Sequence, residues 1–455
     1  MKGMLQKILK KPELVFVLIA SLFGVLSAIM MPILEVPDEN QHFQVSYAIF
    51  SENRKVGDDM VFSDGMLVKQ VEDGNYWSNF TEKNSAADDG VAINTGSRVF
   101  DQKTPASIFD IMRLPQALGV LVGKAIYPSL GIMVLMGRLF VLAVFIVAMY
   151  FIIKKLNYGK WALVFIATFP IVIQQAASLS YDAINMVAIF AWVAFCINLA
   201  TQKTRISLRQ ILIGVGLALF ILASKSNNVL LFVLLLALPL TLISPTALYK
   251  KLQSNKYWLL IKIVSISFII IVLLAAVYVI QLKLVGGNTF DPKLLGSVLL
   301  KTYLWGDLEL IDVTTIGTVG QFGNFYYHLP MWTVILTYIV LAIVMLSEKI
   351  PNVSRRFALV SLGLFFASVV LISVGMYYGW AIQPERLGPG ATVTDGIQGR
   401  YFTPLLILLL APIAYIQKYI KITVKNPKII PVLVTVMSVL LLSLYIAQTF
   451  REFWK

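Results

Sequence analysis

Apolar runs of about 20 residues recur along this chain, and they restrict its fold more than any other feature. A helix of that length crosses roughly 30 Å of hydrocarbon. Lipid offers the backbone no hydrogen-bond partner, so segments that are apolar all round cross a membrane as α-helices. With 58% hydrophobic residues and a mean hydropathy of +0.79, the chain is predicted to be an all-α polytopic membrane protein.

The runs predict a bundle of about 11 transmembrane helices. Their expected positions are 14–34, 131–153, 160–176, 183–201, 210–223, 228–243, 258–282, 329–346, 356–379, 401–417 and 429–450. The spans on either side of Lys225 are short. If they formed one long helix, every later loop would change sides and the basic loops would face outward. We therefore expect a tight outward hairpin there.

Lysine and arginine residues gather in alternate short loops, which is the pattern of cytoplasmic loops. These groups are Lys154, Lys155 and Lys160; Lys203, Arg205 and Arg209; Lys250, Lys251 and Lys256; Lys349, Arg355 and Arg356; and Lys418, Lys421, Lys425 and Lys428. The sequence therefore predicts a multi-pass plasma-membrane protein with a cytoplasmic N-terminus and an extracytoplasmic C-terminus. Because the net charge of +14 lies largely in these loops, no nucleic-acid partner is predicted.

This topology divides the chain into successive parts. They are 1–34, the cytoplasmic N-terminus and first helix; 35–130, a large extracytoplasmic loop; 131–283, helices two to seven; 284–328, a second outer loop; and 329–455, the last helices with an outer loop at 380–400. The first loop holds more than half of the acidic residues. A charged segment directly after the first crossing predicts an active site on the outer face.

Two segments of the first loop have the spacing of amphipathic helices. In 38–52 the apolar positions are Phe43, Tyr47 and Phe50, and in 107–125 they are Ile111, Leu114, Leu118 and Leu121. Helices of this kind lie in the interface between water and lipid. We therefore expect both to lie on the membrane surface.

An acid pair and a histidine stand directly after the first span, in Val36-Pro37-Asp38-Glu39-Asn40-Gln41-His42. A carboxylate at a dry interface has a raised proton affinity and can act as a general base toward a hydroxyl. The alternative is that Asp38 only caps the helix that follows. We interpret Asp38 and Glu39 as catalytic candidates and His42 as a substrate contact.

Asp182 begins the predicted span 183–201 and is the only acidic residue between Asp110 and Asp291. One interpretation is a helix N-cap. The other is a second acid in the pocket of Asp38, where it would position an acceptor or a sugar hydroxyl.

Arg138, Lys225 and Arg400 are predicted near the outer face, where positive charge is disfavoured. Either they extend to lipid headgroups, or they bind a lipid-linked phosphate, for which guanidinium and ammonium groups are well suited. Tyr401, next to Arg400, is a further candidate for substrate contact.

No cofactor is firmly implied. His42 and His328 do not have the spacing of metal ligands, and a divalent metal at Asp38, Glu39 and His42 is conceivable but not indicated. No glycine-rich phosphate loop precedes a Lys-Ser or Lys-Thr pair, so a nucleotide is not indicated either.

Four segments resemble an uncharacterised bacterial family of polytopic membrane proteins, a domain of unknown function grouped with the GT-C glycosyltransferases. They are Val36-Pro37-Asp38-Glu39-Asn40-Gln41-His42-Phe43, Arg113 to Gly119, Ala177-Ser178-Leu179-Ser180-Tyr181-Asp182-Ala183 and Gly399-Arg400-Tyr401-Phe402-Thr403-Pro404. Tyr181 stands where the family usually has proline, and Ser226-Asn227-Asn228 stand where prolines are expected.

The resemblance implies a GT-C-like bundle with Asp38, or else Glu39, as the base that activates an acceptor. The donor would be a sugar on polyprenyl phosphate, and the acceptor a glycan or cell-envelope polymer. Arg400 and Lys225 would hold the phosphate leaving group. A polymerase or ligase of lipid-linked glycans is the alternative. A transporter or flippase is disfavoured, since its charges are expected at the bilayer midplane.

Overall fold

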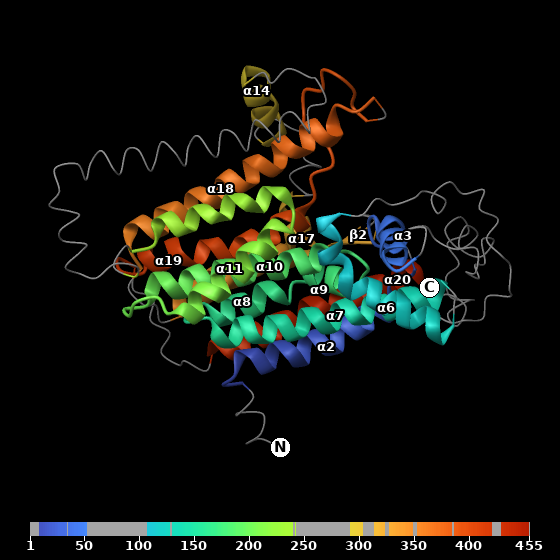
Figure 1. Ribbon diagram of the computed structural model, residues 1–455, viewed down its shortest axis with the longest axis horizontal. Coiled ribbons are helices and arrows are strands. Elements are labelled where there is room, and N and C mark those ends of the chain that lie inside the picture. The colour runs from blue at the N-terminus through green and yellow to red at the C-terminus, as the bar shows by residue number, and fades with distance from the viewer. Residues whose placement is uncertain are drawn as a thin grey trace.

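Five long apolar helices dominate the part of the chain that the computed structural model describes (Figure 1). They are α2 (Pro12–Met30), α7 (Leu130–Lys155), α10 (Asp182–Thr201), α18 (Arg355–Met376) with the π-helical turn η5 (Tyr377–Ala381), and α20 (Ile429–Phe453). Each is long and apolar enough to cross a membrane. The chain is therefore an all-α membrane protein.

The structure describes residues 9–51, 107–239, 242, 292–303, 314–348, 353–420 and 429–454, with gaps at 34, 128–129, 324–326 and 385. Every predicted span except 258–282 coincides with described helical segments, and that span lies outside the described residues. The total of about 11 crossings stays a prediction.

Shorter helices complete the described bundle. They are α8 (Lys160–Ala167), α9 (Pro170–Ala176), α11 (Leu208–Leu222), η3 (Ser226–Ala237), α14 (Pro292–Tyr303), α17 (Met331–Ser347), η7 (Thr403–Leu409) and α19 (Leu410–Ile416). Helices α11 and η3 pack against each other with Lys225 in the turn between them, which is the expected hairpin.

The predicted span 160–176 is two helices, because Pro170 interrupts it. Proline has no N–H and disfavours a helical conformation in the residue before it, and Phe169 is extended (φ −59°, ψ 138°). At the break, the Thr168 hydroxyl bonds the Val164 and Phe165 carbonyls and the Ser438 hydroxyl. Helices α8, α9 and α10 form the buried centre of the bundle, with α2, α7, α17 and α20 around them.

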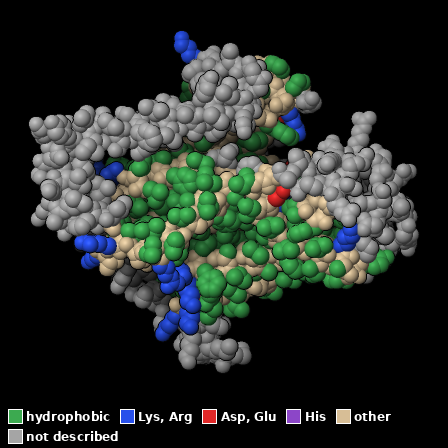
Figure 2. All heavy atoms as spheres, in the orientation of Figure 1, with side chains coloured by type: hydrophobic (Ala, Val, Ile, Leu, Met, Phe, Trp, Pro, Cys, Tyr) green, Lys and Arg blue, Asp and Glu red, His purple; other side chains and the backbone are tan. Residues whose placement is uncertain are grey.

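The two ends of the bundle differ in charge. The basic loop residues lie where α7 and α10 end and where α8, α11 and α18 begin, and Figure 2 shows the larger Lys and Arg group on this face at that end. At the opposite end, the Trp454 indole after α20 donates to the Met30 carbonyl at the end of α2. The start of α2 and the end of α20 therefore lie at opposite ends, as an odd number of crossings requires. Which end faces the cytoplasm stays a prediction.

Short elements gather at the second end, which we call the site end. They are α3 (Glu39–Ile49), η2 (Ile108–Arg113), α6 (Leu114–Ile126), α16 (Gly317–Gly320), η6 (Gly399–Tyr401) and an antiparallel pair of two-residue strands, β1 (Gln321–Phe322) and β2 (Tyr327–His328). In the strand pair, Gln321 is opposite His328.

The prediction that the apolar positions of 38–52 lie on the membrane surface is wrong for Phe43 and Tyr47, whereas Phe50 is exposed. Phe43 and Tyr47 are buried against α6 and α7, in a cluster that includes Val120 and Met133. Helix α6 comes close enough to form this cluster because Gly119 faces α7, where an added Cβ would lie 2.5 Å from the Met136 carbonyl oxygen. In contrast, the predicted apolar positions of α6 and η2 are exposed: Ile111, Leu114, Leu118 and Leu121.

Candidate functional site

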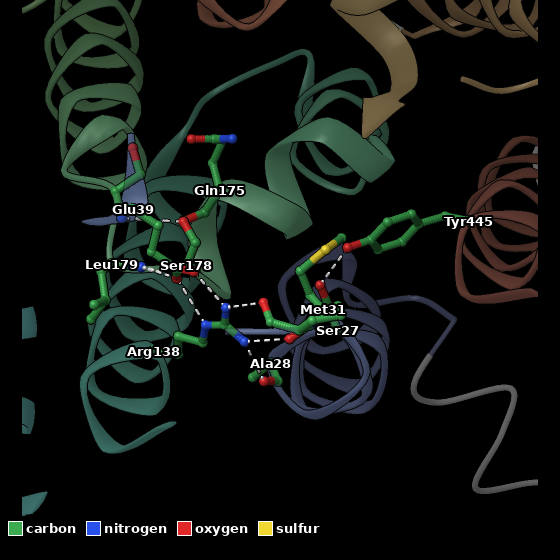
Figure 3. A network of polar contacts seen from close by, with 11 residues as sticks. Ser27, Ala28, Met31, Glu39, Arg138, Gln175, Ser178, Leu179 and Tyr445 are labelled. Atoms are coloured by element: carbon green, nitrogen blue, oxygen red, sulfur yellow. Dashed lines mark hydrogen bonds and ion pairs between the residues drawn. The ribbon is translucent and has the colours of Figure 1, made fainter. Parts of the chain in front are cut away.

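Arg138 and Glu39 form a buried ion pair at the site end (Figure 3). The guanidinium donates from Nε to Glu39 Oε1 at 2.8 Å and from Nη2 to Oε2 at 2.5 Å. Oε1 also accepts the Leu179 N–H at 3.2 Å. The two side chains are only 1% and 0% exposed, so each charge depends on the other for compensation.

The remaining donors of Arg138 bind the carbonyls where α2 ends. Nη1 donates to Ala28 O at 3.0 Å and Met31 O at 2.6 Å, and Nη2 donates to Pro32 O at 2.8 Å. A helix C-terminus leaves carbonyls unsatisfied, and a cation stabilises it. Because all five N–H donors of Arg138 are used in this way, its geometry favours an anchoring role over phosphate binding.

Asp38 lies between the end of α2 and Glu39, both of which Arg138 binds. Its backbone has a left-handed conformation (φ 63°, ψ 11°). It occupies the N-cap position of α3, but within the described residues its side chain makes no capping hydrogen bond. Instead its Oδ2 accepts from Arg400 Nη2 at 3.1 Å. The Asp38 side chain is 50% exposed, whereas that of Arg400 is 3% exposed. Asp38 is therefore the acid of the pair that a substrate can reach.

Arg400 also joins Asp38 to a second acid. Its Nε lies 3.1 Å from Asp182 Oδ2, and Lys225 Nζ lies 2.6 Å from Asp182 Oδ1. Asp182 is the first residue of α10 and Tyr181 is its N-cap, so the interpretation of Asp182 as the N-cap does not hold. The Lys225 ammonium lies 4.3 Å from the ring centroid of Tyr401 and 5.3 Å from that of Tyr181. We call Asp38, Asp182, Lys225 and Arg400 the charge cluster.

Gly399 allows Arg400 to reach the cluster. An added Cβ at Gly399 would lie 2.1 Å from the Gly317 carbonyl carbon and 2.2 Å from the Thr318 nitrogen. Only glycine permits η6 to approach α16 this closely. The Gly-Arg sequence thus places the guanidinium beside a backbone segment that a larger residue would push away.

Replacing Gly399 with Ala is expected to lower the free energy of unfolding by about 1–3 kcal/mol, because a backbone contact must open. Thermal unfolding in detergent measures the change. Gly216→Ala is the control: its Cβ meets no described atom within 4 Å, and alanine favours helix α11. Equal midpoints for Gly399→Ala and the unmodified protein would contradict the close approach.

His42 is buried beside the charge cluster, and its ring makes an edge contact with Tyr181, the centroids 5.2 Å apart. Burial lowers the pKa of His42 to about 4, and the Arg400 and Arg113 charges act in the same direction, against Asp182 and Asp38. His42 is therefore neutral at pH 7, as a polar neighbour of the acids rather than a cation.

This lowered pKa predicts that the protein loses stability as pH falls from about 6.5 to about 4. The unfolded chain takes up the His42 proton first, so the loss between pH 7 and pH 5 is about 2 kcal/mol. Unfolding of the unmodified protein and of His42→Gln at both pH values isolates this contribution. The exposed His328 provides the control His328→Gln, which should keep the full pH dependence. An identical loss in His42→Gln would contradict the assignment.

A small cavity with a volume of about 10 Å³, room for about one water molecule, lies beside Arg400. It is lined by Pro37, Ile171, Gln174, Gln175, Gly317, Gln321, Gln398, Gly399 and Arg400. None of these glutamines was predicted as a site residue from the sequence. Their one signal is the pair Gln174-Gln175 within a predicted apolar span, where neighbouring amides are costly to bury.

The structure therefore brings the four predicted residues of the charge cluster into contact, with the predicted Tyr401 and His42 beside them. Glu39 and Arg138 form a separate pair. Within the described ranges, no group of three or more His, Cys, Asp or Glu side chains is arranged to hold a metal ion. The predicted outer-loop segment 52–106 lies outside the described residues.

A family model described as "Predicted membrane protein (DUF2142)" matches residues 21–409. The chain belongs to this family. The match extends from α2 to η7, so it includes the acid motif, Asp182, Lys225 and Arg400. The resemblance to an uncharacterised family of membrane proteins is thus confirmed, whereas the grouping with GT-C enzymes stays a prediction. Searches of curated proteins and of solved structures find no match.

Proposed function

We propose that this protein is a membrane glycosyltransferase that moves a sugar from polyprenyl phosphate to a glycan or cell-envelope polymer on the outer face of the membrane. The observation that carries the proposal is the half-exposed Asp38 carboxylate, held by the buried Arg400 beside Asp182 and Lys225. A reachable acid next to a buried arginine and a partly exposed lysine suits acid–base chemistry on a phosphate-bearing substrate.

Asp38 is the proposed general base. Glu39 is fully buried and both of its oxygens accept hydrogen bonds from Arg138, so an acceptor hydroxyl has no route to it. The acceptor proton moves to the Asp38 carboxylate as the acceptor oxygen attacks the anomeric carbon. The bond from that carbon to the phosphate oxygen breaks, and polyprenyl phosphate leaves with the electron pair. In-line attack inverts the anomeric configuration.

Arg400 and Lys225 are the proposed phosphate ligands. In this structure the two cations balance the two carboxylates of the charge cluster, so an incoming phosphate adds negative charge that these cations must share. Arg400 has a donor to offer, because its Nη1 has no hydrogen-bond partner among the described residues. Asp182 holds both cations in place, which we interpret as positioning.

Transfer in proteoliposomes tests the proposal. Purified protein is given undecaprenyl phosphate bearing one radiolabelled sugar, from a panel of hexoses and pentoses, together with a cell-envelope fraction. The expected result is label in polymer, release of undecaprenyl phosphate and an inverted anomeric bond. Transfer of one sugar at a time separates this activity from a ligase, which would move a preformed block. If no donor in the panel releases undecaprenyl phosphate, the proposal is rejected.

A further inference from the structure

Three buried polar side chains join α10 to the turn between α11 and η3. They are Asn185, Ser224 and Asn228, which are 7%, 1% and 3% exposed. Asn185 lies in α10, Ser224 lies in the turn after α11, and Asn228 lies in the first turn of η3. None of them was predicted as a site residue from the sequence.

Asn185 accepts two hydrogen bonds from this turn. Its Oδ1 accepts from Asn228 Nδ2 at 2.7 Å and from the backbone N–H of Lys225 at 3.4 Å. Asn228 Nδ2 also donates to the Ser224 hydroxyl oxygen at 2.8 Å, and that hydroxyl donates to the Ile221 carbonyl near the end of α11. The bonds therefore connect α10, η3 and α11 around the backbone of Lys225.

Helix α10 contacts Lys225 at both ends of the residue. Asn185 binds its backbone N–H, and Asp182, one helical turn earlier, lies 2.6 Å from its Nζ. A lysine side chain loses much rotamer freedom when it is fixed, so contacts at the backbone and at the ammonium together determine where the charge lies. An ammonium that is already oriented needs little reorganisation when a charged substrate arrives.

Apolar packing alone gives this turn little support. Helix α11 lies beside α10 (Figure 1), yet among its residues, all of which are described, only Ile221 is buried. In lipid there is no hydrophobic force between helices, because the acyl chains are as apolar as leucine. Hydrogen bonds between helices, such as those of Asn185, are therefore the contacts expected to fix the turn.

We propose that Asn185 is a positioning residue, which fixes Lys225 for the phosphate of the lipid-linked donor. Arg400 and Lys225 both contact Asp182, so a fixed turn keeps the two cations beside each other. The Lys225 side chain is 24% exposed, which leaves part of it accessible to a substrate. This inference rests on the proposed function, because Lys225 is one of its two phosphate ligands.

Chemical labelling of Lys225 tests the positioning without any substrate. The protein in detergent is treated with an amine-reactive reagent, and mass spectrometry follows the modification of Lys225. Asn185→Leu should raise the rate about 10-fold, because an ammonium released from Asp182 loses its proton more readily and only the neutral amine reacts. Trp192→Phe is the matched control and should leave the rate unchanged. It removes another buried bond between α10 and η3, from the Trp192 indole to the Leu231 carbonyl at 3.0 Å.

Binding of undecaprenyl phosphate tests the link to the proposed function. Lys225→Met should weaken binding at least about 10-fold, because a charge-assisted hydrogen bond is lost. Asn185→Leu should weaken binding about 5-fold by itself, and less than about 2-fold in the Lys225→Met background, because it acts through that side chain. A residue that serves only the fold would cost the same affinity in both backgrounds.

Two results overturn the inference. One is an unchanged labelling rate of Lys225 in Asn185→Leu, and the other is an equal loss of affinity in the two backgrounds. Failure of the proposed function looks different. In that case Lys225→Met and the unmodified protein bind undecaprenyl phosphate alike, while Asn185→Leu still raises the labelling rate.

Discussion

Replacing Asp38 with Asn is expected to reduce sugar transfer at least about 100-fold, because a general base contributes roughly 10²–10⁴ to the rate. The amide has the same size but accepts no proton. Asparagine also tolerates the left-handed backbone conformation of Asp38 (φ 63°), so the turn should keep its shape. The proteoliposome transfer assay measures the effect directly.

Stability measurements distinguish lost chemistry from lost structure in this variant. The Asp38 side chain is 50% exposed, so solvent screens its ion pair with Arg400 and the expected change in unfolding free energy is about 0–1 kcal/mol. Asp395→Asn is the matched control, since Asp395 lies in the loop between η5 and η6 and accepts a hydrogen bond only from the Gly396 N–H among the described residues. Full transfer activity in Asp38→Asn would refute its role as base.

Breaking the Glu39–Arg138 pair is expected to destabilise the protein more than any other single change discussed. Removing one partner of a buried pair costs about 3–5 kcal/mol, because the other charge stays buried without compensation. Arg138→Met should destabilise the protein more than Glu39→Gln, since it also leaves the Ala28, Met31 and Pro32 carbonyls without their donor. Glu39→Gln keeps a polar acceptor for the guanidinium.

Unfolding in detergent, monitored by the loss of helical circular dichroism signal, measures which variant is destabilised more. Arg205→Met is the matched control, because Arg205 is exposed and its removal should change the unfolding free energy by less than about 0.5 kcal/mol. The double variant Glu39→Leu with Arg138→Met should lose less than the sum of the single changes, because no lone charge remains. Strictly additive losses would contradict a coupled pair.

The contrast between Asp38 and Glu39 shows how much of the candidate site could be predicted from the sequence. Both acids were predicted as site residues directly after the first crossing, and so were Asp182, Lys225 and Arg400. These predictions follow from a general rule, because charge next to hydrocarbon is costly and so is informative wherever it occurs. The rule treats neighbouring acids alike, and therefore it did not separate the anchoring acid from the accessible one.

Which acidic side chain pairs with which basic one could be seen only in the three-dimensional structure. Asp38 and Arg400 are 362 positions apart, and Glu39 and Arg138 are 99 apart. Arg138 was predicted as a phosphate ligand, but the end of α2 lies within reach of its guanidinium and uses all of its donors. Likewise, the spacing of Phe43 and Tyr47 predicted contact with the membrane surface, yet both side chains pack on α6 and α7.

The sequence by itself determined the helices and their class, because helix formation in lipid depends on local hydrophobicity and on backbone hydrogen bonds within each segment. The break at Pro170 was missed, because 160–176 was predicted as one span although proline disrupts a helix locally. The tertiary structure alone decided which buried charges pair and which glutamines share a small cavity. Those contacts depend on how close two helices approach, and this is set at residues such as Gly399, whose missing side chain lets η6 reach α16.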